Sequence, residues 1–406
     1  MISLVVLLAL AQSADAGVTY EPSDTWPQRI DAIEVQGVSW TKEFVVVREL
    51  PWHAGEEVSH ADWELGTTRL WNTDLFSRID PRVELRPDGR RVAVYVIEER
   101  FTLNPLFSFG IGGGRWWFRV GANDVNWFGR FLEWGVRYER FGEYNGGQGW
   151  LRDPRLFNKR LVGTVQLDFL FRPRPEYVRR RLQGTLDLWG ELNDLTRTGL
   201  KLEVIRDEYL APLEGPSNPP PLLVAGQLTW FQRLGRVDTV RLRQKGWSFE
   251  LREVLGVASS GPERLYAQLF GELLWFQLLG ERFNLAARAQ FGLSTDAPVE
   301  LGFWLGGLDL IRGYADSLIR TQRFALGNLE ARGVIFDTMW VALMGAVFVD
   351  GALTDDGRGI QPLLSVGGGL RLLSPRLVKT GIRADVAVTL TGRPAPGFSF
   401  GVYQFF

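Results

Sequence analysis

Hydrophobic and polar residues alternate along most of the chain after residue 100. Segments of about ten residues follow one another, separated by Gly, Pro, Asp and Asn, and each places apolar side chains at every second position. In residues 161–171, for example, apolar side chains at odd positions alternate with Thr164, Gln166 and Asp168, and residues 182–192, 283–291 and 382–390 repeat the pattern. Alternation with period two predicts β-strands with two different faces, and about sixteen such strands follow without a helix.

The alternation leaves two architectures open. In a soluble all-β protein the apolar face would lie inside, whereas in a transmembrane barrel the apolar face meets lipid and the polar face lines a wet lumen. The number of consecutive segments favours the barrel. So does the content of 16 Trp, 26 Phe and 46 Gly, which is typical of many strands with aromatic belts at the membrane surfaces.

Charge and cysteine content exclude several functions. The 46 basic and 47 acidic residues nearly cancel, so no nucleic-acid partner is expected. With no Cys, the chain has no disulfide, no thiolate metal site and no Cys nucleophile.

Residues 1–16 have the pattern of a signal peptide. An apolar run from Leu4 to Ala11 precedes Ala14-Asp15-Ala16, a small-x-small cleavage site, although no Lys or Arg precedes the run. We expect export, with residues 17–29 as a linker. No other apolar stretch is long enough for a membrane-spanning helix.

Residues 30–100 change pattern several times, as a small α+β domain does. Ser59 and Asp62 form a capping box for a helix that ends near Asn72–Phe76, and Pro51 ends an earlier helix candidate. A Pro87-Asp88-Gly89 turn separates two strands. The predicted order is β-α-α-β-β, with strands at 30–35, 83–86 and 91–97 and helices at 41–50 and 59–72.

Four short motifs lie in the last hundred residues. The first contains Arg312-Gly313-Tyr314 and comes after the eleventh predicted strand, so that five strands follow it. The others are Gly327-Asn328-Leu329-Glu330-Ala331-Arg332, Phe348-Val349-Asp350-Gly351, and the final Tyr403-Gln404-Phe405-Phe406.

Together these motifs resemble the outer-membrane protein assembly superfamily, which includes BamA-type insertases, TamA-type assembly factors and two-partner-secretion transporters. The resemblance implies a POTRA (polypeptide-transport-associated) domain at residues 30–100 in the periplasm and a sixteen-stranded outer-membrane barrel at residues 101–406. It also implies that Phe406 belongs to a carboxy-terminal signal that the host's assembly machinery recognises; as a simpler reading, Phe406 is an interfacial anchor.

In that family the Arg-Gly-Tyr tip lies on a loop that folds into the barrel, where its Arg pairs with the Asp of a Phe-x-Asp-x-Gly strand. Transferred to this chain, Arg312 would pair with Asp350, near Phe348 and Gly351, with Glu330 on the strand between. A guanidinium in a narrow lumen needs a carboxylate, and a bidentate pair would fix the loop. Here Gly351 comes one position earlier than in the family pattern.

The resemblance also implies a weak seam where the first and last strands meet. We expect it at residues 106–114 against 398–406, with Gly110 and Gly112 making the first strand poorly packed. The seam residues are Leu106, Phe107, Gly110, Gly112, Phe398 and Phe400. A client polypeptide would first pair with an exposed strand at Val83, Glu84, Leu85 and Arg86 by β-augmentation.

Other features have simpler explanations. Two glycine triplets, 112–114 and 367–369, lack the Lys-Ser/Thr of a phosphate loop, and His53 and His60 have no third metal ligand beside them. No enzyme activity, cofactor or metal is expected.

The sequence therefore predicts an outer-membrane factor that inserts or transports an extended polypeptide, in contact with lipid and with possible periplasmic accessory proteins. A secretion pore, with residues 308–323 as its plug, and a structural or lipid-handling barrel remain as alternatives.

Overall fold

The computed structural model describes residues 19–20, 26–112, 115–173, 178–193, 195–210, 221–240, 243–260, 264–315, 317–338, 341–357, 359–373, 381–392 and 396–402. It divides into two compact units. The N-terminal unit comprises the residues up to Asn104 together with Asp124–Glu133, and the barrel unit comprises Pro105–Asn123 and the residues from Trp134 onwards.

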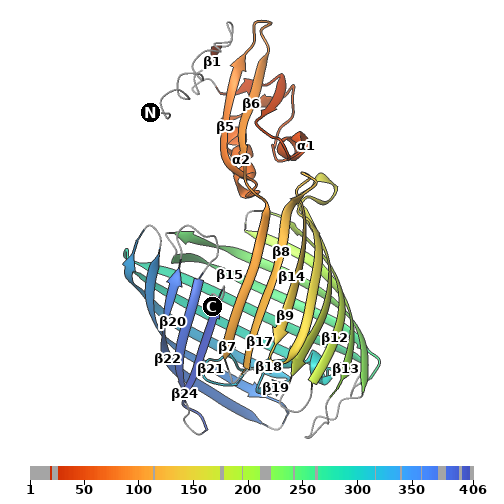
Figure 1. The fold of residues 1–406 in the computed structure, drawn as a ribbon, viewed down its shortest axis with the longest axis vertical. Helices are drawn as coiled ribbons and strands as arrows, with labels where there is room; N and C mark the ends of the chain where they lie inside the picture. The colour runs from red at the N-terminus through yellow and green to blue at the C-terminus, as the bar shows by residue number, and fades with distance from the viewer. Residues whose placement is uncertain are drawn as a thin grey trace, which may run out of the picture. The chain divides into compact units, whose positions relative to one another are not determined.

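The N-terminal unit is a small α+β domain with the predicted order β-α-α-β-β, to which three two-residue strands are added (Figure 1). Its main sheet has the order β1-β5-β6-β3, with β3 parallel to β6 and the other pairs antiparallel. Its elements are β1 (Thr19–Tyr20), β2 (Gln28–Arg29), β3 (Ala32–Gln36), α1 (Glu43–Val47), β4 (Glu57–Val58), α2 (His60–Asn72), β5 (Phe76–Leu85) and β6 (Arg91–Glu99).

The capping box positions α2 on the sheet. The Ser59 hydroxyl accepts a hydrogen bond from the backbone N–H of Asp62, so the helix begins at His60. The helix then buries Trp63 and Leu70 against Tyr95 and other residues of the sheet. β5 is longer than predicted: it begins at Phe76, a buried residue of this same core.

The turn Asp124–Glu133 is part of this unit although it joins two barrel strands. The Asn126 side chain donates to the Thr41 hydroxyl at 2.8 Å, and the Trp40 indole donates to the Asn126 carbonyl at 3.0 Å. Phe131 lies in the unit's hydrophobic core. The turn is therefore held by hydrogen bonds as well as by apolar contact.

Glu99 organises the segment that meets this turn. Partial burial acts to raise the pKa of Glu99, but hydrogen bonds from Thr41, Trp40 and Ser39 outweigh it and lower that pKa from 4.5 to about 2. Because the carboxylate accepts hydrogen bonds from several N–H and O–H groups, its ionised form stabilises the backbone conformation of residues 39–41.

The barrel unit is a closed, antiparallel, sixteen-stranded barrel, as predicted. Eleven strands precede the segment with Arg312 and five follow it, also as predicted. The strands are β7 (Leu103–Gly112), β8 (Arg115–Trp127), β9 (Leu132–Phe141), β10 (Tyr144–Asp153), β11 (Leu161–Pro173), β12 (Val178–Glu191), β13 (Thr196–Tyr209), β14 (Leu222–Val240), β15 (Arg243–Ala258), β16 (Leu265–Leu279), β17 (Phe283–Ser294), β20 (Arg323–Asp337), β21 (Ala342–Asp355), β22 (Ile360–Leu373), β23 (Gly381–Thr389) and β24 (Pro396–Val402).

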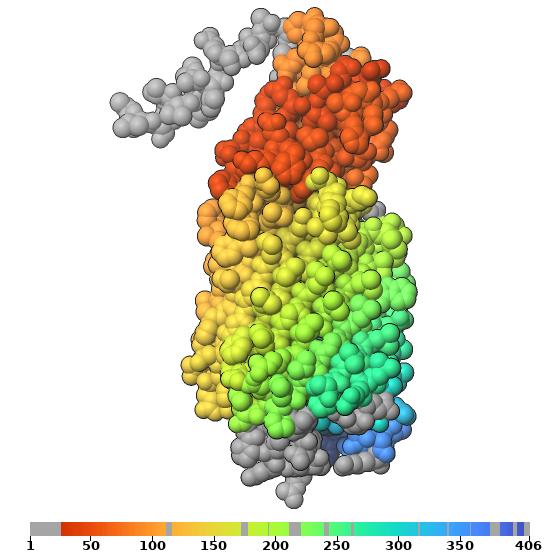
Figure 2. Space-filling model, turned by 90° about the vertical axis from the view of Figure 1, so that its right-hand side faces the viewer, coloured from red at the N-terminus to blue at the C-terminus, as the bar shows by residue number. Residues whose placement is uncertain are grey.

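Strands that are adjacent in sequence are adjacent in the wall, so the colours of the space-filling view change gradually across the visible face of the barrel from yellow to blue-green (Figure 2). A short 3-10 helix, Leu156–Asn158, precedes β11.

The two faces of the wall resolve the choice between a soluble protein and a transmembrane barrel. On β11, Val165 and Leu167 are 54% and 63% exposed on the outside, whereas Asp168 is 4% exposed inside. Across the barrel, many Leu, Val, Phe and Trp side chains are exposed, and the buried side chains include many Arg, Asp and Glu. This is the reverse of a soluble fold and matches an apolar band that faces lipid around a polar lumen.

Among the described residues, no helix is both long enough and apolar enough to cross a bilayer.

Candidate functional site in the barrel lumen

The segment between β17 and β20 folds into the barrel. After the 3-10 helix Val299–Leu301, β18 (Phe303–Leu305) pairs with β19 (Ile319–Thr321) as a short hairpin. Between the two strands of this hairpin, Gly306, Gly307 and Gly313 adopt positive φ angles, which are readily accessible only to glycine. These glycines allow tight turns that bring Arg312 to the tip of the segment. Residues 306–315 are called the tip loop below.

Arg312 is buried and pairs with the predicted partner. Its Nε and Nη2 atoms donate to the two carboxylate oxygens of Asp350 at 2.7 Å each, which is a bidentate pair, and its backbone N–H donates to Asp350 at 3.1 Å. Its Nη1 atom donates to Glu330 at 2.5 Å. The guanidinium also lies over the Phe348 ring, 3.3 Å from the centroid. Arg312 and Asp350 are 2% and 0% exposed, so this pair is withdrawn from water.

Neighbouring strands extend this pair into a network. Asn328 on β20 lies opposite Asp350 on β21 in the strand register and donates to its carboxylate at 2.8 Å. The same Asn328 amide donates to the Leu310 carbonyl in the tip loop, also at 2.8 Å. Its Oδ1 atom accepts from Arg288 of β17, which also donates to the Asp309 carbonyl. The tip loop is therefore bonded through backbone carbonyls as well as through Arg312.

A second group of charges lies beside the first. Glu330 accepts hydrogen bonds from Arg332 at 2.7 Å and from Arg371 on β22 at 3.1 Å. Arg371 and Arg383 are directly opposite each other in the register of β22 and β23, and Asp385 accepts from both. Because like charges that face each other repel, this carboxylate is what allows the two guanidinium groups to lie together. The network thus links the tip loop to β20, β21, β22 and β23.

Apolar contacts fix the other side of the tip loop. Ile311 and Tyr314 pack with Leu305 of β18, with Phe324 of β20 and with further residues of β20, β21 and β22. The Tyr314 hydroxyl lies 3.1 Å from the Leu364 carbonyl, to which it donates, and 2.5 Å from the Thr391 hydroxyl. These bonds join the loop to β22 and to the segment that follows β23.

The tip loop also touches the last strand of the barrel. A Cβ atom added at Gly397 would lie 2.8 Å from the Cα atom of Gly313, and one added at Gly313 would lie 3.3 Å from Ala387 and Thr389. The backbones of the loop and of β24 are therefore packed as closely as two glycines permit.

The predicted seam is the meeting of β24 and β7. In the described part of these strands, Phe400 pairs with Ile111 and Gly401 with Gly110. Phe107 and Phe398 are exposed on the outer face, and Leu106 and Gly112 also lie on these strands. Phe406 and residues 113–114 lie outside the described residues, as do residues 1–16.

The prediction that Gly110 is poorly packed is wrong. Gly110 is buried, and a Cβ atom there would lie 2.7 Å from the indole ring of Trp117 on β8. Gly110 therefore makes room for an aromatic side chain.

The predicted client strand also needs correction. β5 is not a free edge at Glu84 and Leu85, because β1 pairs with these two residues through Tyr20 and Thr19. The side chains of Val83 and Glu84 are buried, and Arg86 lies beyond the strand.

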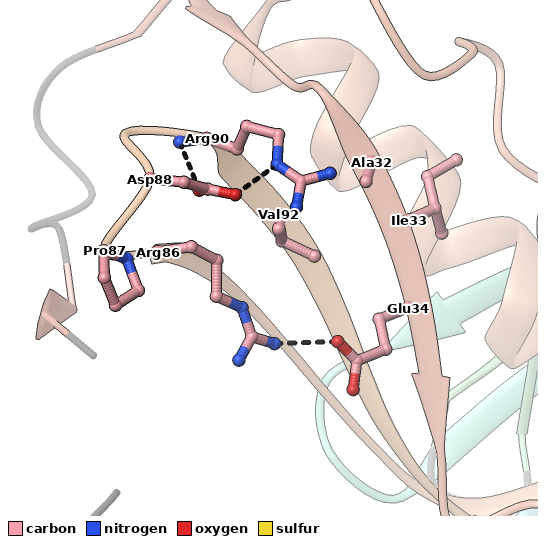
Figure 3. Close-up of a pocket in the computed structure, with 8 residues that line it drawn as sticks. All are labelled: Ala32, Ile33, Glu34, Arg86, Pro87, Asp88, Arg90 and Val92. Atoms are coloured by element: carbon pink, nitrogen blue, oxygen red, sulfur yellow. Dashed lines mark hydrogen bonds and ion pairs between the residues drawn. The ribbon is translucent and has the colours of Figure 1, made fainter. Parts of the chain in front are cut away.

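The face of the sheet near these residues carries a groove of about 480 Å³, lined by Ala32, Ile33, Glu34, Arg86, Pro87, Asp88, Arg90 and Val92. Figure 3 shows two ion pairs among these residues: Arg86, just after β5, pairs with Glu34 of β3, and Arg90 pairs with Asp88 within the turn.

Several members of the lumen network are not identified by the sequence motifs. Arg288, Arg371, Arg383 and Asp385 all occupy polar positions of alternating segments, which predicts that they face the lumen. The alternation cannot tell which of them meet, because their contacts depend on the register between strands and on the path of the tip loop.

Three solved structures are similar to this chain. BamA from Haemophilus ducreyi lacking POTRA domains 1-3 has 15% sequence identity and a TM-score of 0.70, over 95% of this chain and 88% of that chain. CdiB from Acinetobacter baumannii has 14% identity and a TM-score of 0.62, over 95% and 77%. CdiB from Escherichia coli has 13% identity and a TM-score of 0.62, over 95% and 80%.

No family model matches the sequence, and no curated protein matches it. At such low identity the likeness establishes the fold: the chain has the sixteen-stranded barrel architecture of the BamA and CdiB structures.

Proposed function

We propose that this chain is an outer-membrane factor of the assembly superfamily, which inserts or transports polypeptides. In this proposal the N-terminal unit is a periplasmic POTRA domain and Phe406 is the end of an assembly signal. The observation that carries the proposal is the bidentate pair of Arg312 and Asp350, which holds a loop inside a closed barrel. The BamA and CdiB structures support it through their common fold.

The N-terminal unit would receive the client as an extended strand. Support comes from β1, which adds to the edge of β5 in the antiparallel direction at Glu84 and Leu85. Backbone hydrogen bonds of this kind do not depend on side-chain identity, so one edge could accept many clients. In this proposal a client strand replaces residues 19–20 at this edge.

The barrel would then act at the seam between β7 and β24. The tip loop contacts β24 through Gly313 and Gly397. The charge network also joins the loop to the four strands β20, β21, β22 and β23. Because opening of the seam displaces β24, it would disturb the packing of the tip loop. The loop would therefore resist opening until a client strand supplies new backbone pairing.

The test is the folding rate of an unfolded outer-membrane barrel protein added to liposomes that contain this chain. We expect a clear acceleration over empty liposomes. An oxidised Ile111→Cys/Phe400→Cys pair should abolish the acceleration, since these residues face each other across the seam. The chain has no other Cys.

The matched control is an oxidised Val165→Cys/Leu186→Cys pair, which locks β11 to β12 away from the seam and should leave the acceleration intact. Full activity with the seam locked would contradict lateral opening. Absence of acceleration by the folded wild-type chain would contradict insertase activity.

A second candidate is a secretion pore through which a partner polypeptide leaves. The charged inner wall favours this function, because a wet lumen can hold an extended polar chain. Deletion of residues 308–323 should then raise the single-channel conductance in planar bilayers sharply. An unchanged conductance would argue against the pore.

A further inference from the structure

Glu253 is a carboxylate on the outer face of the barrel. On β15 it shares the outward face with Trp247, Leu255 and Val257, which are 48%, 61% and 57% exposed. In the strand register it lies between Trp230 of β14 and Leu269 of β16. The immediate neighbours of this acid are therefore apolar.

The position of Glu253 along its strand puts it near the middle of the apolar band. The band on β15 extends from Trp247 to Val257, which is about 33 Å along the strand and about 25 Å along the barrel axis at a tilt of about 40°. That length matches the apolar band of outer-membrane barrels. Glu253 is thus close to the bilayer midplane, where ionisable residues are rare and usually functional.

A groove of about 560 Å³ surrounds this carboxylate. On the outer face its walls are made by side chains that include Leu228 and Trp230 on one side and Leu269 and Leu293 on the other. Ala267 is the small residue that leaves the space open between them. Most of the lining is apolar, the neutral polar residues are Gln268, Ser294 and Thr295, and Glu253 is its only ionisable residue. The groove therefore suits a mainly apolar occupant that carries one positive charge.

Glu253 has no hydrogen-bond or ion-pair partner among the described residues. The acid three positions away on the same strand, Glu250, faces the lumen and pairs with Arg233 and Arg252. The fold therefore supplies cations to the acid inside the barrel and none to the acid outside it. A lone charge in hydrocarbon is costly, and a cation from outside the chain would offset that cost.

We propose that this groove binds a transmembrane segment of a second membrane protein, which presents a lysine or arginine to Glu253. The groove lies on β14, β15, β16 and the end of β17, which are the eighth to eleventh of sixteen strands counted from β7. It is therefore on the wall opposite the seam, where a partner would leave the seam free. The inference requires the barrel to span a bilayer, but it does not depend on the proposed transport function.

Two other occupants fit the charge less well. Lipid headgroups lie at the membrane surface, about 15 Å from the midplane, so their cations do not reach Glu253. A second copy joined by two-fold symmetry at this face would bring Glu253 close to its own counterpart. The outward basic residues nearby, Arg206 on β13, Arg236 on β14 and Lys245 on β15, lie near the ends of those strands and at other depths.

The test is site-specific photocrosslinking in native outer membranes, with a photoreactive residue in place of Leu228 in the full-length chain. We expect an adduct with one membrane protein, mapped by mass spectrometry to a transmembrane strand that contains Lys or Arg. Glu253→Gln should reduce the adduct about tenfold or more, because it leaves the partner's cation unpaired in hydrocarbon. Glu281→Gln, the same change in an exposed turn, should not alter it.

A second measurement keeps the test independent of folding. In liposomes without a partner, Glu253→Leu should raise the resistance of the barrel to urea, because it removes an unpaired charge from lipid. Adducts with lipid alone, or with a second copy of this chain, would overturn the proposal. So would a protein adduct whose yield is the same in Glu253→Gln.

Discussion

Replacement of Arg312 by alanine should release the tip loop from the barrel wall. The change removes the two bonds to Asp350 and the bond to Glu330. Glu330 keeps Arg332 and Arg371 as partners, whereas Asp350 keeps hydrogen bonds from Asn328 and from the backbone N–H of residue 312 but loses its bidentate cation. The main cost is therefore a buried carboxylate without its counterion.

The size of this cost follows from the burial of Arg312 and Asp350, which are 2% and 0% exposed. Loss of one partner from a buried ion pair costs about 3–5 kcal/mol. At about 1.4 kcal/mol per factor of ten, the docked tip loop should become about 100- to 4000-fold less favoured relative to the released loop. Arg312→Lys should give an intermediate loss, because an ammonium group cannot form the same bidentate pair.

Amide hydrogen exchange of residues 306–315, measured by mass spectrometry on the protein in liposomes, reports this equilibrium directly. Exchange there should accelerate by that factor in Arg312→Ala, while exchange in β11 stays the same. The control is Arg236→Ala, whose partner Asp238 is exposed. This variant should change exchange neither in the tip loop nor in β11. Adding Asp350→Asn to Arg312→Ala should recover part of the protection, since it removes the unpaired charge. Less than threefold acceleration in Arg312→Ala would refute this account of the loop.

Three further predictions concern other contacts. Gly397→Ala should also accelerate exchange in the tip loop, because the added Cβ atom would clash with the Gly313 backbone. The control is Gly327→Ala, because no atom lies within 4 Å of a Cβ atom added at Gly327. The N-terminal unit should lose stability as pH falls from about 4.5 to about 2, because the depressed pKa of Glu99 means that its ionised form stabilises the fold. Hydrogen exchange at residues 39–41 measures this pH dependence, and Glu99→Gln should remove the part that is due to Glu99. Ser59→Ala should lower the free energy of unfolding of the N-terminal unit by about 1 kcal/mol in urea titration, and an unchanged midpoint would show that the cap contributes nothing.

The strands of the barrel are predictable because their signal is local. Each segment carries the period-two pattern within about ten residues, and Gly, Pro, Asp and Asn mark the turns. The count of eleven strands before Arg312 and five after it therefore follows from the sequence alone and agrees with the structure. The same holds for α2, since Ser59 and Asp62 are close in sequence.

The candidate site is only partly predictable. Arg312 and Asp350 are proposed as partners through motifs, and the structure brings them together. The roles of Arg371 and Asp385 depend on which residues face each other across β22 and β23, and a shift of one residue in that register would send them to the lipid side. The pairing of β1 with β5 is equally invisible, because two residues carry too little pattern.

The number of strands, their alternating faces and the small α+β unit could be predicted from the sequence, because these depend on neighbouring residues. The folded barrel was needed to show which face is enclosed, which charges meet in the lumen, and that Glu253 faces outward among mainly apolar side chains. Alternation distinguishes two faces of each strand but does not say what surrounds them, whereas closure of the barrel assigns one face to the lumen and the other to lipid.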